Sequence, residues 1–286
     1  MISGGQAALT PVGPVLLVDR LPPLHAELMS LLHGLEPADW NRPTTCAPWS
    51  VKDITAHLLD TSLRRLSFGR DGLDPAPAAV ITGYADLVSY LNRLNSEWVT
   101  ATKRLSPVVL MGLLDFTASQ VHAFLQSLDP YAPAVFPVSW AGEDKSPNWF
   151  DIGREYTERW LHQQQIREAV AAPGLTGRPW LHPTLDIFVR ALPHTFRHTE
   201  AAAGSSIRLD IQGEAGGVWT LVRSAAGWEL FLGSGRTPSA EISLDQETAW
   251  KLFSKGLDRG SAARRTQIQG DRRLGETVLT SLAIMA

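Results

Sequence analysis

Apolar residues in the first part of the chain recur every three or four positions, which is the period of an amphipathic α-helix. In residues 18–35 one such stripe consists of Leu21, Leu24, Leu28, Leu31 and Leu32. Further helices are predicted at residues 51–68, 84–104, 107–128 and 148–172. Loops of uneven length separate them, so the first 172 or so residues predict an all-helical domain.

Local signals mark where these helices begin and end. Ser50 is a good N-cap, and Asp53 three residues later completes a pattern like a capping box. Pro107 suits the first turn of its helix, and Pro173 with Gly174 closes the last one. Between the helices, residues 36–48, 69–78 and 130–147 are rich in proline, glycine and polar residues, which predicts loops.

The last hundred residues change to a period of two, which is typical of half-buried strands. Strands are predicted at residues 207–211, 218–222, 228–232, 240–244 and 266–269, with a hairpin turn at 224–227. Asp245 can cap a helix that ends at Lys255, and Asp271 can cap a final helix that reaches Met285. The tail therefore predicts a small α+β domain, with domains at 1–177 and 178–286.

Composition narrows the class of protein. The 286 residues are 44% hydrophobic and 19% charged, as in a soluble globular protein, and the net charge is −3. No Lys/Arg stripe alternates with aromatic residues, so no nucleic-acid partner is expected. One basic cluster is predicted to be a solvated face, with binding of an anionic ligand as the alternative. It consists of Arg259, Arg264, Arg265, Arg272 and Arg273.

A single cysteine, Cys46, excludes an internal disulfide framework and a cysteine-rich zinc site. It fits a reducing cytoplasm, and the alternative of a nucleophilic thiol lacks an obvious constellation of His with Asp or Asn. The first 17 residues have no signal-peptide pattern, and no stretch approaches the ~20 apolar residues of a membrane span. A cytoplasmic protein without a membrane partner is expected.

Three residues carry the candidate chemistry. Glu158 and His162 are four positions apart in a helix, so their side chains share one face, and His57 lies in another helix. If they converge, two imidazoles and one carboxylate suit a divalent metal ion that keeps one position open for water or substrate. The alternative is a surface Glu–His pair with an ordinary core histidine at position 57.

Other histidines and one further carboxylate are weaker candidates. His194 and His198 form a second pair four positions apart, in the connecting segment, and His122 fits a helix core. Glu155 is one turn before Glu158, where a carboxylate could hold a ligand imidazole or simply face solvent. Trp49, Trp149 and Trp160 flank these motifs and are expected in the core or in a pocket wall.

Two segments resemble the mycothiol-dependent maleylpyruvate isomerase family, which belongs to the wider DinB-like metal-binding helical bundles. They are residues 46–58, CAPWSVKDITAHL, and residues 155–167, EYTERWLHQQQIR. Residues 268–274, IQGDRRL, resemble part of a sterol-carrier-like α+β domain. The resemblance implies a DinB-like four-helix bundle followed by that domain, with His57, Glu158 and His162 as metal ligands.

The resemblance also implies the cofactors. It implies a divalent metal, with zinc the first choice and nickel possible, and a low-molecular-weight thiol such as mycothiol or bacillithiol. Two positions depart from the family. Gln165 stands where an acidic residue is expected, and the tail arginine that engages substrate has no sure counterpart among Arg259, Arg272 and Arg273.

These observations predict an enzyme that uses the thiol for isomerisation or S-transfer on a small electrophile. Two alternatives stay open: a non-catalytic protein that binds a metal and a lipid-like ligand, and a metal-dependent hydrolase that uses water in place of the thiol. The expected partner is a small-molecule substrate, and the chain is expected to be a monomer or a homodimer.

Overall fold

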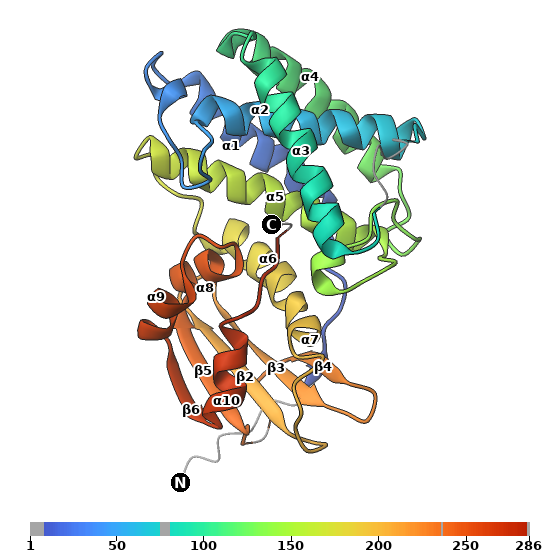
Figure 1. Ribbon diagram of the computed structural model, residues 1–286, viewed down its shortest axis with the longest axis vertical. Coiled ribbons are helices and arrows are strands. Elements are labelled where there is room, and N and C mark those ends of the chain that lie inside the picture. Colours follow the sequence, from blue (N-terminus) through green and yellow to red (C-terminus); the bar gives the residue numbers. More distant parts are fainter. Residues whose placement is uncertain (1–8, 75–80, 236, 285–286) are drawn as a thin grey trace. The chain divides into compact units, whose positions relative to one another are not determined.

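The computed structural model describes residues 9–74, 81–235 and 237–284, which form two compact units (Figure 1). The described part of the helical unit comprises residues 16–137, with the gap at 75–80, and residues 145–175. The described part of the sheet unit comprises residues 9–15, 138–144 and 176–284, without 236. Both units are discontinuous along the chain, whereas the sequence predicts domains at 1–177 and 178–286. That boundary stays a prediction.

The helical unit contains long helices close to where the apolar period predicts them. They are α1 (Leu21–His33), α2 (Val51–Arg64), α3 (Tyr84–Thr102), α4 (Pro107–Gln126) and α5 (Asn148–Ala169). Short helical turns η1 (Val18–Arg20) and η2 (Asp39–Asn41) flank α1, and a π-helical segment η3 (Arg65–Arg70) extends α2. Part of the predicted loop at 69–78 lies outside the described residues.

Helix α2 is the centre of this unit, because it packs against α3, α4 and α5, while α1 packs against α4 and α5 (Figure 1). The predicted fold class, a helical bundle followed by an α+β domain, is confirmed. The core of the bundle consists of apolar side chains from α1, α2, α4 and α5 and from the turn η2. It comprises Leu28, Leu32, Trp40, Val51, Ile54, Ala56, Leu58, Leu59, Leu110, Leu114 and Ile166.

The start of α2 is fixed as predicted. The Ser50 side chain accepts a hydrogen bond from the Asp53 backbone N–H, and the Asp53 carboxylate accepts one from the Ser50 N–H at 3.0 Å. These reciprocal bonds satisfy two N–H groups that the first turn would otherwise leave unpaired. Asp53 also pairs with Lys103 at 2.6 Å. Because the cap sets where α2 begins, it also sets the direction in which His57 projects, two turns later.

Helix α4 contradicts the expectation that the chain contains no segment long and apolar enough to span a membrane. Within the described residues it is a helix long and apolar enough to cross a membrane, with a mean hydropathy of 1.5, so the statement that no stretch approaches that length is wrong. This is weak evidence for a membrane span, because core helices of soluble proteins meet the same criterion. Leu110, Leu114 and Val121 of α4 are buried in the bundle.

The sheet unit is built on a mixed sheet with the strand order β1-β4-β3-β2-β5-β6, in which β2 and β5 are parallel and the other neighbours antiparallel. The strands are β1 (Thr10–Pro11), β2 (Ser206–Gln212), β3 (Gly217–Arg223), β4 (Trp228–Leu232), β5 (Ala240–Asp245) and β6 (Gln267–Gly270). Strands β2 to β6 and the β3–β4 hairpin agree with the predicted positions. Strand β1 was not predicted, since two residues show no alternation.

Helices of the sheet unit are α6 (Arg178–Phe188), α7 (Leu192–Thr195), α8 (Gln246–Phe253), α9 (Arg259–Arg264) and α10 (Arg272–Val278), with short turns η4 (Ser139–Ala141) and η5 (Val189–Ala191). Helix α6 was not predicted from the sequence, because a proline such as Pro183 usually interrupts a helix. The helix tolerates this proline while burying Leu181, Leu185 and Phe188. The predicted final helix is too long: α10 ends at Val278, and its predicted end at Met285 lies outside the described residues.

Candidate metal centre

Helices α2 and α5 present the three candidate ligands to one another. The helices are antiparallel, because His57 of α2 meets Glu158 of α5, and Arg65, at the start of the η3 extension of α2, meets Asp151, two turns earlier in α5. Glu158 and His162 are adjacent on one face of α5, as their spacing predicts. The structure therefore brings His57 together with Glu158 and His162, although 101 residues separate His57 from Glu158 in the sequence.

The three side chains are close enough together to share one metal ion. One Glu158 oxygen, Oε1, is 3.0 Å from His57 Nε2 and 3.2 Å from His162 Nε2. All three ligand atoms lie within 4.8 Å of one another. Ligands at the 2.0–2.1 Å bond lengths of zinc would be about 3.3 Å apart at the corners of a tetrahedron. The donor set of two imidazoles and one carboxylate thus fits a borderline divalent ion.

Burial and mutual charge set the proton affinities of the group. Burial disfavours the charged carboxylate of Glu158, but the two imidazoles beside it hold its pKa well below the usual range. Burial alone would lower the pKa of His162, but the neighbouring Glu158 carboxylate raises it above its usual value. For His57 burial dominates and lowers the pKa. His57 and His162 are buried, while the Glu158 side chain is 34% exposed, so the group is accessible from the Glu158 side.

Gln165, outside the three candidate ligands, orients one of the two imidazoles. Gln165 Oε1 is 2.7 Å from His162 Nδ1. If Nδ1–H donates to that oxygen, Nε2 keeps its lone pair directed at the metal position. Gln165 is thus the residue that stands where an acidic one was expected, and an amide oxygen can perform the same orienting role. His57 Nδ1 is buried without a hydrogen-bond partner among the described residues.

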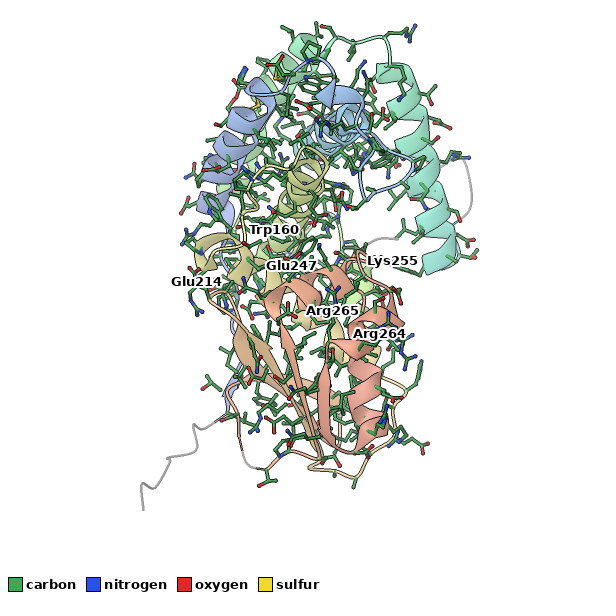
Figure 2. All side chains as sticks on the ribbon, turned by 90° about the vertical axis from the view of Figure 1, so that its left-hand side faces the viewer. Trp160, Glu214, Glu247, Lys255, Arg264 and Arg265 are labelled. Carbon is green, nitrogen blue, oxygen red and sulfur yellow. The ribbon has the colours of Figure 1, made fainter. Side chains whose placement is uncertain are left out.

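Trp49 forms a wall beside both imidazoles. Its ring centroid is 4.8 Å from that of His57 and 6.2 Å from that of His162. The backbone around it is held by a bond from the Thr44 hydroxyl to the Trp49 carbonyl at 2.7 Å. Trp49 therefore lies against both candidate ligands, and its place in a pocket wall stays a prediction. Trp160, labelled in Figure 2, is instead a core residue that is fully buried and donates to the Leu175 carbonyl.

Both predictions for Glu155 are wrong, since it neither holds an imidazole nor faces solvent. It is buried and accepts bonds from Arg65 Nη2 at 3.1 Å and from Arg159 Nε at 2.8 Å. Arg65 also binds Asp151, which in turn pairs with Arg154. Burial disfavours charge on Asp151 and Glu155, but the surrounding guanidinium groups hold both pKa values below the usual range.

The weaker histidine and cysteine candidates do not join the site. In the described part of the chain, a single group of three metal-ligating side chains comes together, and it contains neither His194 nor His198. The His194 ring packs against Gly142, whose φ of +78° and lack of a side chain leave room for it. Burial, with Glu158 adding to it, raises the pKa of the Cys46 thiol to about 11, which disfavours a reactive thiolate.

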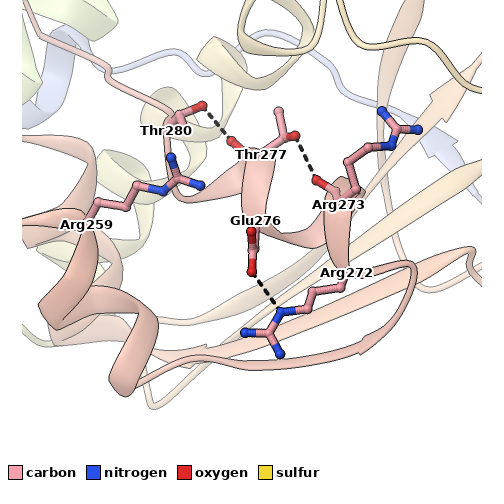
Figure 3. A pocket seen from close by; sticks show the side chains of 6 residues that line it. All are labelled: Arg259, Arg272, Arg273, Glu276, Thr277 and Thr280. Atoms are coloured by element: carbon pink, nitrogen blue, oxygen red, sulfur yellow. Dashed lines mark hydrogen bonds and ion pairs between the residues drawn. The ribbon is translucent and has the colours of Figure 1, made fainter.

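The basic cluster lies in the sheet unit. Arg259, Arg272 and Arg273 line a pocket of about 670 Å³ together with Glu276, Thr277 and Thr280 (Figure 3). Glu276 pairs with Arg272 at 2.8 Å, and Arg273 donates to the Glu200 carbonyl. Arg264 and Arg265, labelled in Figure 2, lie at the end of α9. An anionic ligand stays a prediction for this cluster.

Comparisons with known proteins agree with the resemblance seen in the sequence. A family model described as the mycothiol maleylpyruvate isomerase N-terminal domain matches residues 21–167, which include all three candidate ligands. No curated protein matches the chain significantly.

Among solved structures, a mycothiol-dependent maleylpyruvate isomerase is similar, with a TM-score of 0.50 and 10% identity over 83% of this chain and 88% of that chain. A solved variant of such an isomerase has a TM-score of 0.49 and 10% identity over the same shares. At this identity the first of these similarities shows the fold alone.

Proposed function

Because the chain belongs to the mycothiol maleylpyruvate isomerase N-terminal domain family, we propose that it is a divalent-metal-dependent enzyme with a low-molecular-weight thiol cofactor. The proposed cofactor is mycothiol or a related thiol such as bacillithiol. The proposed reaction is isomerisation of, or S-transfer to, a small electrophile, in the manner of a maleylpyruvate isomerase. A cytoplasmic location and a sterol-carrier-like role for the sheet unit are part of the same proposal.

The observation that carries the proposal is the convergence of His57, Glu158 and His162 around one point. A bound divalent ion would supply a positive charge that lowers the pKa of a coordinated thiol or water. The three side chains would hold that ion from two helices and leave a position open. Gln165 would keep His162 in the tautomer that a metal requires, and Trp49 would exclude water from the rings.

The number and burial of the three candidate ligands support the choice of an enzyme. Burial of the two imidazoles and partial exposure of Glu158 are typical of a site that is closed on the protein side and reachable from one direction. A structural metal site normally has four protein ligands, whereas three ligands are typical of catalytic zinc. A hydrolase would use the same position for water, so dependence on thiol is the distinguishing property.

The test is a turnover assay on purified protein with a panel of small electrophiles, maleylpyruvate first, with and without mycothiol. We expect turnover only when both the thiol and the metal are present, loss on treatment with a chelator, and recovery with zinc. His162→Ala should abolish both bound metal and turnover. His33→Ala is the matched control, because His33 is exposed on α1. Thiol-independent turnover would favour the hydrolase, and absence of any turnover together with a co-purified lipid would favour the binding protein.

A further inference from the structure

Helix α4 exposes large apolar side chains on the side that the bundle leaves uncovered. The other side of α4 packs against α1 and α2 and supplies buried residues to the core. On the uncovered side Val108 is 73% exposed, Val109 47%, Leu113 41% and Phe116 67%. Val109, Gly112 and Phe116 follow one another at intervals of three and four positions, so they lie on one face of the helix. We call this face, which consists of Val108, Val109, Gly112, Leu113 and Phe116, the α4 patch.

The α4 patch carries no charge. From Pro107 to Gln126 the sequence has a single Asp, Glu, Lys or Arg, which is Asp115. Asp115 lies toward α1, where its Oδ1 is 3.1 Å from Nε2 of His25. The exposed side of a helix on the surface of a soluble protein normally carries charged and polar residues. The uncharged apolar patch therefore indicates a surface that another molecule covers.

Gly112 lies in the middle of the α4 patch, and its own chain gives no reason for a glycine there. Its backbone is helical, and a Cβ at this position would have nothing within 4 Å outside the adjoining backbone of the helix. A glycine inside a helix destabilises it relative to alanine, and close approach by another group is a common reason for keeping one. Gly112 leaves an open notch on the helix surface one turn before Phe116, the largest side chain of the patch.

The size of the α4 patch matches what a stable dimer needs. At the ~150–200 Å² of a large apolar side chain, the exposed fractions of its four large residues leave roughly 400 Å² of apolar surface in water. A dimer of standard size buries about 800 Å² of each copy, somewhat more than half of it apolar. The patch therefore supplies most of the apolar area of such a contact, and the polar residues beside it can form the rim.

We propose that the α4 patch is the contact surface of a homodimer, in which two copies of α4 run antiparallel about a two-fold axis. Phe116 of each copy packs into the notch at Gly112 of the other copy. Two-fold symmetry makes these contacts equivalent, because ring and notch lie one turn apart on the same helix. The antiparallel arrangement also sets the positive end of each helix dipole beside the negative end of the other. The inference is independent of the metal centre and of the proposed reaction.

A second copy fits the α4 patch better than a membrane does. Helices that lie on a membrane surface are rich in Lys and Arg on their polar side, and α4 has neither residue. A second copy also supplies both the aromatic ring and the notch that receives it, so the patch is complementary to itself. This self-complementarity favours a copy of the chain over a different protein.

Sedimentation equilibrium of the full-length protein, from about 0.1 to 100 µM, measures the dissociation constant of the dimer. We expect dimers to predominate above about 10 µM, as for a small but specific interface. Phe116→Ala should raise the dissociation constant at least ~100-fold, because the symmetry removes two aromatic contacts at once. Tyr131→Ala is the matched control, since Tyr131 is a 65% exposed aromatic residue outside α4, and it should leave the dissociation constant unchanged.

Gly112→Ala distinguishes a notch in the contact from a merely structural glycine. The added methyl group fills the notch in both copies and should raise the dissociation constant at least ~10-fold. The same change should raise the urea midpoint of the monomer, because alanine favours a helix more than glycine does. That midpoint is measured by tryptophan fluorescence in the monomeric Phe116→Ala background, with and without Gly112→Ala.

A wild type that stays monomeric at about 100 µM overturns the inference, and so does a dimer that Phe116→Ala does not weaken. A dissociation constant that Gly112→Ala leaves unchanged or lowers also overturns it. If wild-type monomers instead sediment with phosphatidylcholine vesicles, and Phe116→Ala abolishes this binding, the α4 patch is a membrane-binding surface and the dimer is refuted.

Discussion

Removal of the Arg65 side chain should destabilise the helical unit strongly. Arg65 is buried, with 5% of its side chain exposed, and it joins α2 to α5 through Asp151 and Glu155, whose side chains are 3% and 5% exposed. Arg65→Met fills a similar volume without charge, so two buried carboxylates lose a shared partner. Breaking a buried ion pair in this way costs about 3–5 kcal/mol, because each buried carboxylate keeps a single guanidinium partner, Arg154 or Arg159, and gains no solvent in place of Arg65.

The assay is equilibrium unfolding in urea, followed by far-ultraviolet circular dichroism at neutral pH. Arg93→Met is the matched control, because its pair with Glu97 is 47% and 65% exposed and should contribute less than about 1 kcal/mol. Adding Asp151→Asn to Arg65→Met should recover part of the lost stability, since it removes one of the two buried carboxylates that have lost Arg65. Its other partner, Arg154, is 27% exposed and can be solvated. A loss below about 1 kcal/mol for Arg65→Met, or no recovery in the double variant, would refute the reasoning.

Three further predictions concern pH and the second layer of the site. The pKa values of Asp151 and Glu155 are lower in the folded than in the unfolded chain, so the stability that they contribute is present above their unfolded pKa and should be lost as the pH falls through the folded values, as acid unfolding would show. Because the pKa of His162 is raised in the metal-free protein, zinc must displace a proton from it. Zinc affinity, measured against a chromogenic chelator, should therefore fall as the pH is lowered from about 8 to 6, and a pH-independent affinity would contradict this. Gln165→Leu should lower zinc affinity about 10- to 100-fold while Gln165→Glu retains it, and equal affinity of both variants would exclude the orienting role.

The helices and most strands were predictable because their signals are local. The apolar period, the Ser50–Asp53 cap and the alternating tail strands each depend on neighbours within a few residues, and the structure confirms them. Strand β1 carries no such signal, since its two residues pair with β4 only in the folded chain. Helix α6 was not predicted for the opposite reason. Pro183 is a strong local signal against a helix, and the burial of Leu181, Leu185 and Phe188 outweighs it.

The candidate site was predictable in part. The shared face of Glu158 and His162 follows from helix geometry. The approach of His57 depends on how α2 packs against α5, so the residue types left it as one of two alternatives, and the family resemblance favoured it. The buried pairs of Arg65 could not be foreseen, because a charged residue in a helix normally faces solvent. The placement of Gln165 against His162 follows from a spacing of three residues, so the signal was present in the sequence.

The central claim is that two imidazoles and one carboxylate from α2 and α5 hold a single divalent ion. X-ray absorption at the metal edge of the purified, zinc-reconstituted protein addresses it directly. The account predicts a shell of nitrogen and oxygen at about 2.0–2.1 Å, with the outer-shell scattering of two imidazoles. A protein that takes up no stoichiometric zinc, or a spectrum without imidazole scattering, would contradict it.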